Sequence, residues 1–130
     1  MYISYGVQEG STNVFQIEYY MKINGRKPVK EFLDQLNKGA RAKAFILIDL
    51  LGEFGPLMRY PYSRHLQDGI FELRIQESGN SLRVLYFFFQ GQRAVLTHGF
   101  VKKTQKTPPR EIERARASRL EYQGRRLPNG

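Results

Sequence analysis

Hydrophobic and polar side chains alternate between residues 15 and 24, and a repeat of two residues is typical of a half-buried β-strand. Asn24 and Gly25 favour a turn at the end of this strand. Apolar positions then recur at helical spacing, and Pro28 suits the first turn of a helix because no backbone N–H is needed there. Residues 40–54 are apolar on most sides, which predicts a second helix in the centre of the core.

Four further strands are predicted in the second half of the chain, joined by consecutive hairpins with turn signals such as Asp68-Gly69. They cover residues 64–66, 70–76, 82–90 and 93–101, and a terminal helix is expected over residues 110–122. Helices that are segregated from the strands in this way favour an α+β fold. We expect a mainly antiparallel sheet of about five strands, with two N-terminal helices packed on one face and a C-terminal helix. The other face of the sheet would then be free to bind a ligand.

The length of 130 residues suits one domain, which we place at residues 14–122. Residues 1–13 show no clear hydrophobic period and are expected to form a loose arm. Residues 123–130 are expected to form a flexible tail.

The chain is strongly basic, with 21 Lys and Arg against 12 Asp and Glu and a formal net charge of +9. Most of the excess lies in residues 59–130, which hold fourteen basic and six acidic side chains. Clustered cations repel one another unless a counter-charge is present, so a polyanion or an acidic protein is the expected partner. A basic surface that only aids solubility is the alternative.

Several classes of chemistry are excluded or disfavoured. The absence of cysteine excludes disulfides, thiolate nucleophiles and Cys-ligated zinc. The two histidines, His65 and His98, stand apart from each other, so neither a metal nor another cofactor is expected. The longest apolar run, residues 84–89, is far shorter than the roughly 20 residues of a membrane span, and no secretory signal is recognisable. A soluble, cytoplasmic protein that does not bind membranes is expected.

Residues 70–90 hold the most informative charges. Alternation places Glu72 and Arg74 on the face opposite the apolar side chains, and a turn at residues 77–80 would set Arg74 across from Arg83. Two arginines directly across a strand pair repel each other. An anion bound between them would explain the pair, because the guanidinium fork suits phosphate geometry. Neutralisation by Glu72 and Glu77 is the alternative.

A second group of cations follows the last predicted strand. Lys102, Lys103 and Lys106 lead into the terminal helix, whose N-terminus after Pro108 offers further donors to backbone phosphates. A solvated basic connector would explain the same spacing. His98, late in the last strand, is either a proton carrier or a hydrogen-bonded sheet residue.

Three segments resemble the motifs of HigB-like toxins, the phage-derived branch of the RelE/ParE superfamily of toxin–antitoxin systems. They are RHLQDGIFELR at residues 64–74, SLRVLYF at residues 81–87 and HGFVKKT at residues 98–104. The resemblance implies a RelE-like fold and metal-independent cleavage of mRNA in the ribosomal A site, with attack by the RNA's own 2′-hydroxyl. It also implies a helix-turn-helix antitoxin as cognate partner, and an indirect association with DNA through that antitoxin.

The resemblance also implies roles for individual residues. Arg83 and Arg74 match basic positions that bind the scissile phosphate, and Lys102 or Lys103 matches the basic position after the last strand. Glu72 stands where the family has a second basic residue, so it is either a general base or the ion-pair partner of an arginine. The predicted catalytic residues are Arg83, Arg74, Lys102, Lys103 and Glu72, and the predicted RNA contacts are Lys106, Arg64 and His98.

One family position is vacant in this chain. The C-terminal tyrosine of RelE falls close to Ile112, and Tyr122 is a poor substitute by position. Two other functions remain open at this point: a ParE-like toxin directed at a topoisomerase, and a non-enzymatic basic module that binds an acidic partner or DNA.

Overall fold

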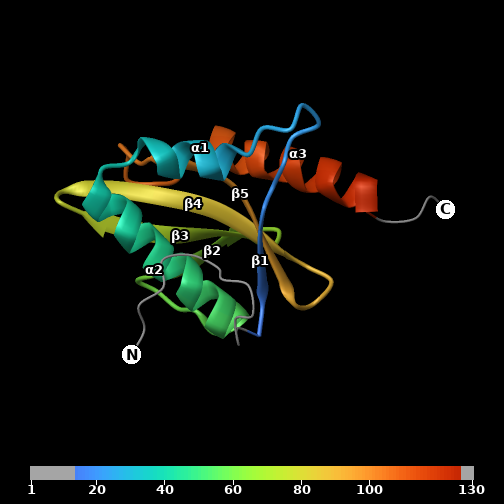
Figure 1. Cartoon of the computed structure of the whole chain (residues 1–130), viewed down its shortest axis with the longest axis horizontal. Coiled ribbons are helices and arrows are strands. Elements are labelled where there is room, and N and C mark those ends of the chain that lie inside the picture. The colour runs from blue at the N-terminus through green and yellow to red at the C-terminus, as the bar shows by residue number, and fades with distance from the viewer. Residues whose placement is uncertain (1–13, 127–130) are drawn as a thin grey trace.

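The computed structural model describes residues 14–126, and both the predicted arm at residues 1–13 and residues 127–130 lie outside the described part. A five-stranded sheet forms the centre of the fold, with strand order β1-β5-β4-β3-β2 (Figure 1). The strands are β1 (Gln16–Tyr19), β2 (Ser63–Gln67), β3 (Ile70–Glu77), β4 (Asn80–Phe89) and β5 (Arg93–Val101). The helices are α1 (Pro28–Gln35), α2 (Lys38–Phe54) and α3 (Pro109–Arg126), and a short 3₁₀ turn, Gly55–Leu57, follows α2.

The sheet confirms the predicted class and the number of strands. β2, β3, β4 and β5 pair in antiparallel hairpins, while the edge strand β1 runs parallel to β5. In the β3–β4 hairpin, Arg74 pairs with Arg83 and Gln76 pairs with Ser81, which is the register that the turn at residues 77–80 predicted. The two arginines therefore lie side by side on one face of the sheet.

Helices α1 and α2 cover one face of the sheet, as predicted. Apolar side chains of both helices form a core with the alternate side chains of the central strands that point toward these helices. This core includes Val29, Leu33 and Ile48 of the helices and Leu73, Val84 and Leu96 of the strands. Asn37 caps α2, because its side chain accepts a hydrogen bond of 2.9 Å from the Ala40 N–H. A Cβ at Gly99 would lie 2.2 Å from the Phe32 ring, so this glycine lets α1 approach β5 closely.

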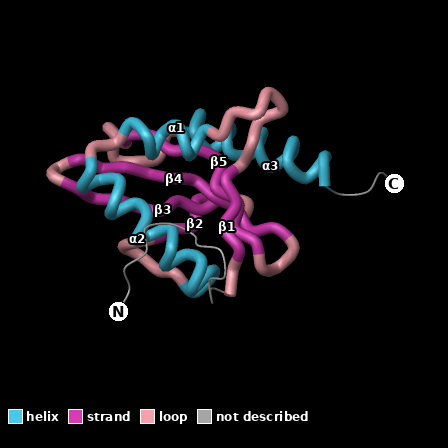
Figure 2. Tube along the Cα trace, in the orientation of Figure 1, coloured by secondary structure: helices cyan, strands magenta, loops and turns pink. Residues whose placement is uncertain are grey.

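The prediction that the opposite face is free is wrong for the part of that face that α3 covers. α3 packs there and encloses a second core with residues that include Ile70, Leu85, Phe87, Val95, Ala115 and Tyr122. Figure 2 shows the strands lying between α2 on one side and α3 on the other. The sequence pattern did not reveal this packing because α3 presents only a few apolar side chains to the sheet.

α3 also extends further than expected, so residues 123–126 of the predicted tail are helical. The last turn is held by contacts of two arginines with β1, with Met21 and with Glu121 of the same helix. Arg126 pairs with Glu18 of β1 at 2.9 Å, and Arg125 pairs with Glu121 and bonds to the Met21 carbonyl. Within residues 14–126, no helix combines the length and the apolar character needed to cross a bilayer.

Candidate anion-binding site

α3 covers part of the second sheet face, and the part that it does not cover carries a group of cations. Strand register places Arg64 opposite Glu72, and Arg74 opposite Arg83, so all four lie on this face. Lys102 joins them from the end of β5, where its backbone N–H donates to the Ser81 carbonyl at 2.7 Å. We call Arg64, Arg74, Arg83 and Lys102 the basic cluster. It brings together four residues that are up to 38 positions apart in the sequence.

Glu72 is the carboxylate at the centre of the basic cluster, and its side chain is buried. Its Oε2 accepts a hydrogen bond of 2.9 Å from Arg74, and its Oε1 accepts one of 2.6 Å from the Thr107 hydroxyl. The Nε of Arg83 lies 3.5 Å from the same Oε1. Both oxygens are engaged away from solvent, which favours the ion-pair alternative for Glu72 over the general-base alternative.

Arg83 lies at the floor of the basic cluster and is 3% exposed. One Nη donates to the Leu82 carbonyl at 2.9 Å. Within residues 14–126, the Nε of Arg83 is the buried side-chain nitrogen that lacks a hydrogen-bond partner. Burial lowers the pKa of Arg83 from its ordinary value, and the charge of Arg74 adds to this shift while Glu72 opposes it. An anion would satisfy both the unused N–H and the excess charge.

Arg74 and Lys102 form the middle of the basic cluster. The Arg74 guanidinium lies 4.9 Å from the centre of the Tyr60 ring, and its Nε donates to the Pro61 carbonyl at 3.1 Å. Burial lowers the pKa of Lys102, and the positive charge of Arg83 lowers it further. Arg64 is exposed and is directly accessible to an anion from solvent. Arg83 is buried, so an anion can contact it only if the side chains that cover Arg83 move.

His98 lies on the same sheet face as the basic cluster but is buried there under the start of α3, which disfavours its predicted contact with RNA. It is 1% exposed, with Nε2 hydrogen-bonded to Glu111 at 3.0 Å and Nδ1 within 3.1 Å of the Thr97 hydroxyl. Burial lowers the pKa of His98 to about 4, and the charge of Arg114 acts in the same direction. His98 is therefore a neutral sheet residue that joins β5 to the first turn of α3.

Lys103 and Lys106 are exposed on the connector between β5 and α3, and they stay predicted contacts. Two residues that sequence reasoning missed contact the site: Thr107 donates a hydrogen bond to Glu72, and the Tyr60 ring lies against the Arg74 guanidinium. A loop rich in aromatic residues and proline was the signal available for Tyr60, whereas nothing local marks Thr107. Within residues 14–126, no three His, Asp or Glu side chains are grouped so that they could hold a metal ion.

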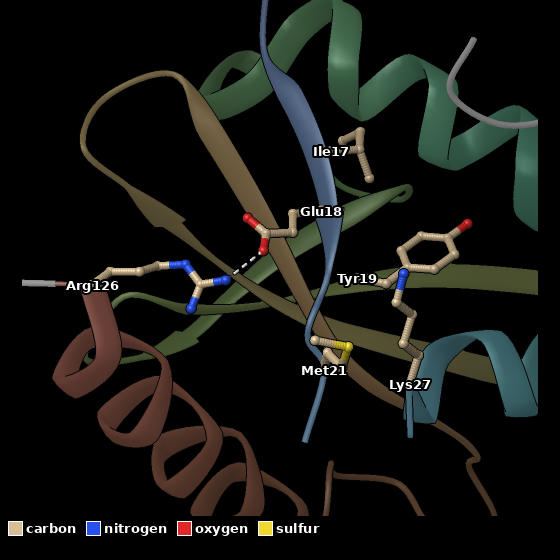
Figure 3. Close-up of a pocket in the computed structure, with 6 residues that line it drawn as sticks. All are labelled: Ile17, Glu18, Tyr19, Met21, Lys27 and Arg126. Atoms are coloured by element: carbon tan, nitrogen blue, oxygen red, sulfur yellow. Dashed lines mark hydrogen bonds and ion pairs between the residues drawn. The ribbon is translucent and has the colours of Figure 1, made fainter. Parts of the chain in front are cut away.

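Away from the basic cluster, a cavity of about 400 Å³ lies between β1, the start of α1 and the end of α3 (Figure 3). It is lined by Ile17, Glu18, Tyr19, Met21, Lys27 and Arg126. Glu18 pairs with Arg126 and accepts a hydrogen bond of 2.7 Å from the Tyr122 hydroxyl. These contacts fasten α3 to β1, so the basic cluster is the better candidate for a functional site.

The fold and the candidate site define a small basic α+β protein with a cluster of cations on a sheet face that α3 only partly covers. The sequence profile of the family described as "Phage derived protein Gp49-like" matches residues 31–120, and the chain belongs to this family. It is also 36% identical over 95 residues to the "Probable endoribonuclease HigB1" proteins of two strains of Mycobacterium tuberculosis. Each alignment covers 72% of this chain and 72% of the relative. The predicted resemblance to HigB-like toxins is confirmed.

Proposed function

We propose that this protein is the toxin of a type II toxin–antitoxin system and that it cleaves mRNA as an endoribonuclease. The observation that carries the proposal is the basic cluster, in which four cations surround one buried carboxylate. Such an excess of positive charge needs an anion, and an RNA phosphate fits both the charge and the guanidinium fork. Family membership and the activity named for the HigB1 relatives support the same function.

The cleavage chemistry assigns different tasks to the basic cluster. The 2′-hydroxyl loses its proton and attacks the adjacent phosphorus, and the bond to the 5′-oxygen breaks. This oxygen takes up a proton from water, so the products are a 2′,3′-cyclic phosphate and a 5′-hydroxyl. Arg83 and Arg74 stabilise the negative charge that develops on the phosphate oxygens. Glu72 acts through these arginines as a positioning residue, because it bonds to one and lies 3.5 Å from the other.

Lys102 is the proposed proton acceptor for the 2′-hydroxyl. Burial and the neighbouring Arg83 lower its pKa, which increases the fraction of neutral amine at a given pH. A lysine with a lowered pKa can accept a proton where an ordinary surface lysine cannot. Lys103 and Lys106, exposed on the same connector, are proposed to contact the RNA backbone.

The partners of this proposal follow from charge and resemblance. The substrate is mRNA in the ribosomal A site, which places the activity in the cytoplasm. A helix-turn-helix antitoxin with acidic character would neutralise the net charge of +9 and would bring the toxin to DNA indirectly.

A short induction of the protein in growing bacteria tests the proposed function. We expect growth arrest, loss of pulse-labelled protein synthesis and new transcript 5′ ends inside coding regions, none of which an Arg83→Ala variant produces. New ends in a purified system only when ribosomes are added would establish ribosome dependence. Collapse of DNA synthesis with normal translation would favour the ParE-like alternative, and unimpaired growth would favour the non-enzymatic module.

A further inference from the structure

A small pocket lies beside the basic cluster at the edge strand β2, where the chain between α2 and β2 folds over the sheet. Its volume is about 280 Å³, just below the roughly 300–1,000 Å³ of typical small-molecule sites. The walls include Met58, Arg59, Tyr60, Arg64, His65 and Phe71. We call it the edge pocket. We propose that it binds one base of the same RNA strand whose phosphate lies in the basic cluster, an inference that rests on the proposed function.

The edge pocket and the basic cluster share a boundary. Arg64 lines the pocket and, through the β2–β3 register, lies opposite Glu72 of the site. Tyr60 also lines the pocket, while its ring lies 4.9 Å from the guanidinium of Arg74. His65 pairs with Phe71, so both rings lie on the sheet face that α1 and α2 cover, whereas the basic cluster lies on the other face. A nucleotide whose phosphate contacts Arg64 or Arg74 would place its base in the pocket by passing around the free edge of β2, where Tyr60 lines the pocket and lies against Arg74.

The walls of the edge pocket suit a flat, aromatic occupant. The His65 and Phe71 rings lie with their centres 4.9 Å apart, and Phe71 stacks on the buried Tyr86 at 5.4 Å. The His65 Nε2 accepts a hydrogen bond of 3.1 Å from the Gly69 N–H, which fixes the ring. Unpaired RNA bases stack on such aromatic faces and on arginine planes.

Charge and exposure favour RNA over other occupants. Tyr60 lines the pocket and is 68% exposed, so part of its ring is available to a ligand. Arg59 and Arg64 make the pocket positive and disfavour a cationic occupant. An acidic peptide with an aromatic side chain has similar chemistry, but the neighbouring phosphate site favours a nucleotide.

The test uses a fluorescent 2′-O-methyl RNA hexamer, which cannot be cleaved because the attacking hydroxyl is blocked, and a hexamer of the same charge without bases. Anisotropy titrations compare the wild type with His65→Ala, Tyr60→Ala and His65→Phe. Stacking of about 1–3 kcal/mol per base corresponds to about a 5- to 150-fold loss of RNA affinity. We expect this loss for His65→Ala and Tyr60→Ala, and near wild-type affinity for His65→Phe.

Two controls separate the edge pocket from the proposed function. Phe54→Ala removes an exposed aromatic side chain outside the pocket and should leave RNA affinity unchanged. His65→Ala should leave the affinity for the hexamer without bases unchanged, whereas Arg83→Ala should weaken binding of both hexamers.

Each remaining outcome overturns the inference in an identifiable way. Equal affinity of the wild type and His65→Ala for RNA, with Arg83→Ala still impaired, removes the edge pocket and leaves the proposed function standing. Equal weakening of both hexamers by His65→Ala has the same consequence. Binding of neither hexamer by the wild type removes both proposals. His65-dependent binding of a tyrosine-containing acidic peptide, without His65-dependent binding of RNA, would identify a protein-docking pocket instead.

Discussion

Arg83 shows how a single buried cation can define a site. It lies on β4 among apolar neighbours, is nearly inaccessible, and has Arg74 directly across the strand pair. Burial of a charge is costly unless a counter-charge and hydrogen bonds compensate it. Glu72 compensates part of this cost, and the unused Nε–H is the part that a phosphate would complete.

The first prediction concerns the charge and shape of Arg83. Arg83→Ala should reduce cleavage by about 10²–10³-fold, the usual loss for one preorganised donor to a developing negative charge. Arg83→Lys should recover only part of this activity, because an ammonium keeps the charge but lacks the bidentate fork. Growth arrest and transcript cleavage are the measurements, and Lys106→Ala, on the exposed connector, should reduce both less than Arg83→Ala does. Full toxicity of a folded Arg83→Ala variant would contradict the assignment.

The second prediction concerns Glu72. Glu72→Gln removes the carboxylate and leaves the cations of the basic cluster without their counter-charge, so the free energy of unfolding should fall by about 3–5 kcal/mol. Thr107→Val removes one hydrogen bond to the same carboxylate and should cost less, about 1.5–3 kcal/mol. Urea unfolding measures both values. Unchanged stability together with lost cleavage would instead indicate a direct role of Glu72 in proton transfer.

The third prediction concerns the proposed proton acceptor. Since only the neutral amine of Lys102 can accept a proton, cleavage should rise with pH until this group is deprotonated. The lowered pKa moves that rise below the range of an ordinary lysine. Lys102→Arg keeps the positive charge and should abolish the rise, which a pH–rate profile at saturating ribosomes would show. An identical profile for the two proteins would exclude Lys102 from this role.

At the scale of elements, α3 determines how much of the second sheet face is accessible. Its apolar side chains close the second core, its last turn is tied to β1 through Glu18, and its first turn is joined to β5 by the Glu111–His98 hydrogen bond. The connector before α3 supplies Thr107 to Glu72. The position of α3 and the geometry of the basic cluster are therefore coupled.

The fourth prediction tests this coupling through pH. The pKa of His98 is about 4 in the folded protein and near its ordinary value of 6.5 in the unfolded chain. As pH falls from about 6.5 to about 4, the unfolded chain binds the proton first, so the folded state loses stability over this interval. Glu111 and Arg114 are the charged groups that face the ring. The urea midpoint should fall more between neutral and acidic pH for the wild type than for His98→Gln.

The exposed histidine provides the control for this measurement. His65→Gln should keep the loss of stability that His98 causes on acidification, because this change leaves His98 and its contact with Glu111 in place. If His98→Gln and the wild type lose the same stability between neutral and acidic pH, the buried histidine does not contribute to the pH dependence.

At the scale of the whole molecule, the segregation of charge governs association. Residues 59–130 carry most of the positive excess, and Arg64 of β2, Arg74 of β3 and Arg83 of β4 lie on one face of the sheet. Long-range attraction of this kind accelerates encounter with an acidic partner more than it strengthens the final complex. It is also screened by salt beyond about 8 Å at physiological ionic strength.

The fifth prediction follows for the antitoxin. Its association rate with this protein should fall steeply as salt rises, while the dissociation rate changes little. Stopped-flow mixing over a salt series measures both rates. The paired substitutions Lys103→Gln and Lys106→Gln remove two positive charges from the connector and should flatten the salt dependence. Association that is indifferent to salt in the wild type would contradict an electrostatic mode of recognition.

The amino-acid sequence by itself determined the features that depend on neighbouring residues. The alternation of side chains and the hairpin turns were sufficient for four antiparallel strands, and the turn at residues 77–80 set Arg74 opposite Arg83. Pro28 marked the start of α1, and the apolar run of α2 marked its place in the core. These are local signals, because backbone period and turn geometry act over a few residues.

Only the tertiary structure decided the features that join distant segments. The parallel pairing of β1 with β5, the packing of α3 on the second face, the contact between Glu72 and Thr107 and the burial of His98 all connect separate elements. No periodicity encodes such contacts, because their free energy comes from surfaces and charges that meet only after the chain has folded. The tertiary structure therefore separates charged and titratable residues that look alike in the sequence. His98 is buried and supports the fold, whereas the basic cluster forms the candidate site.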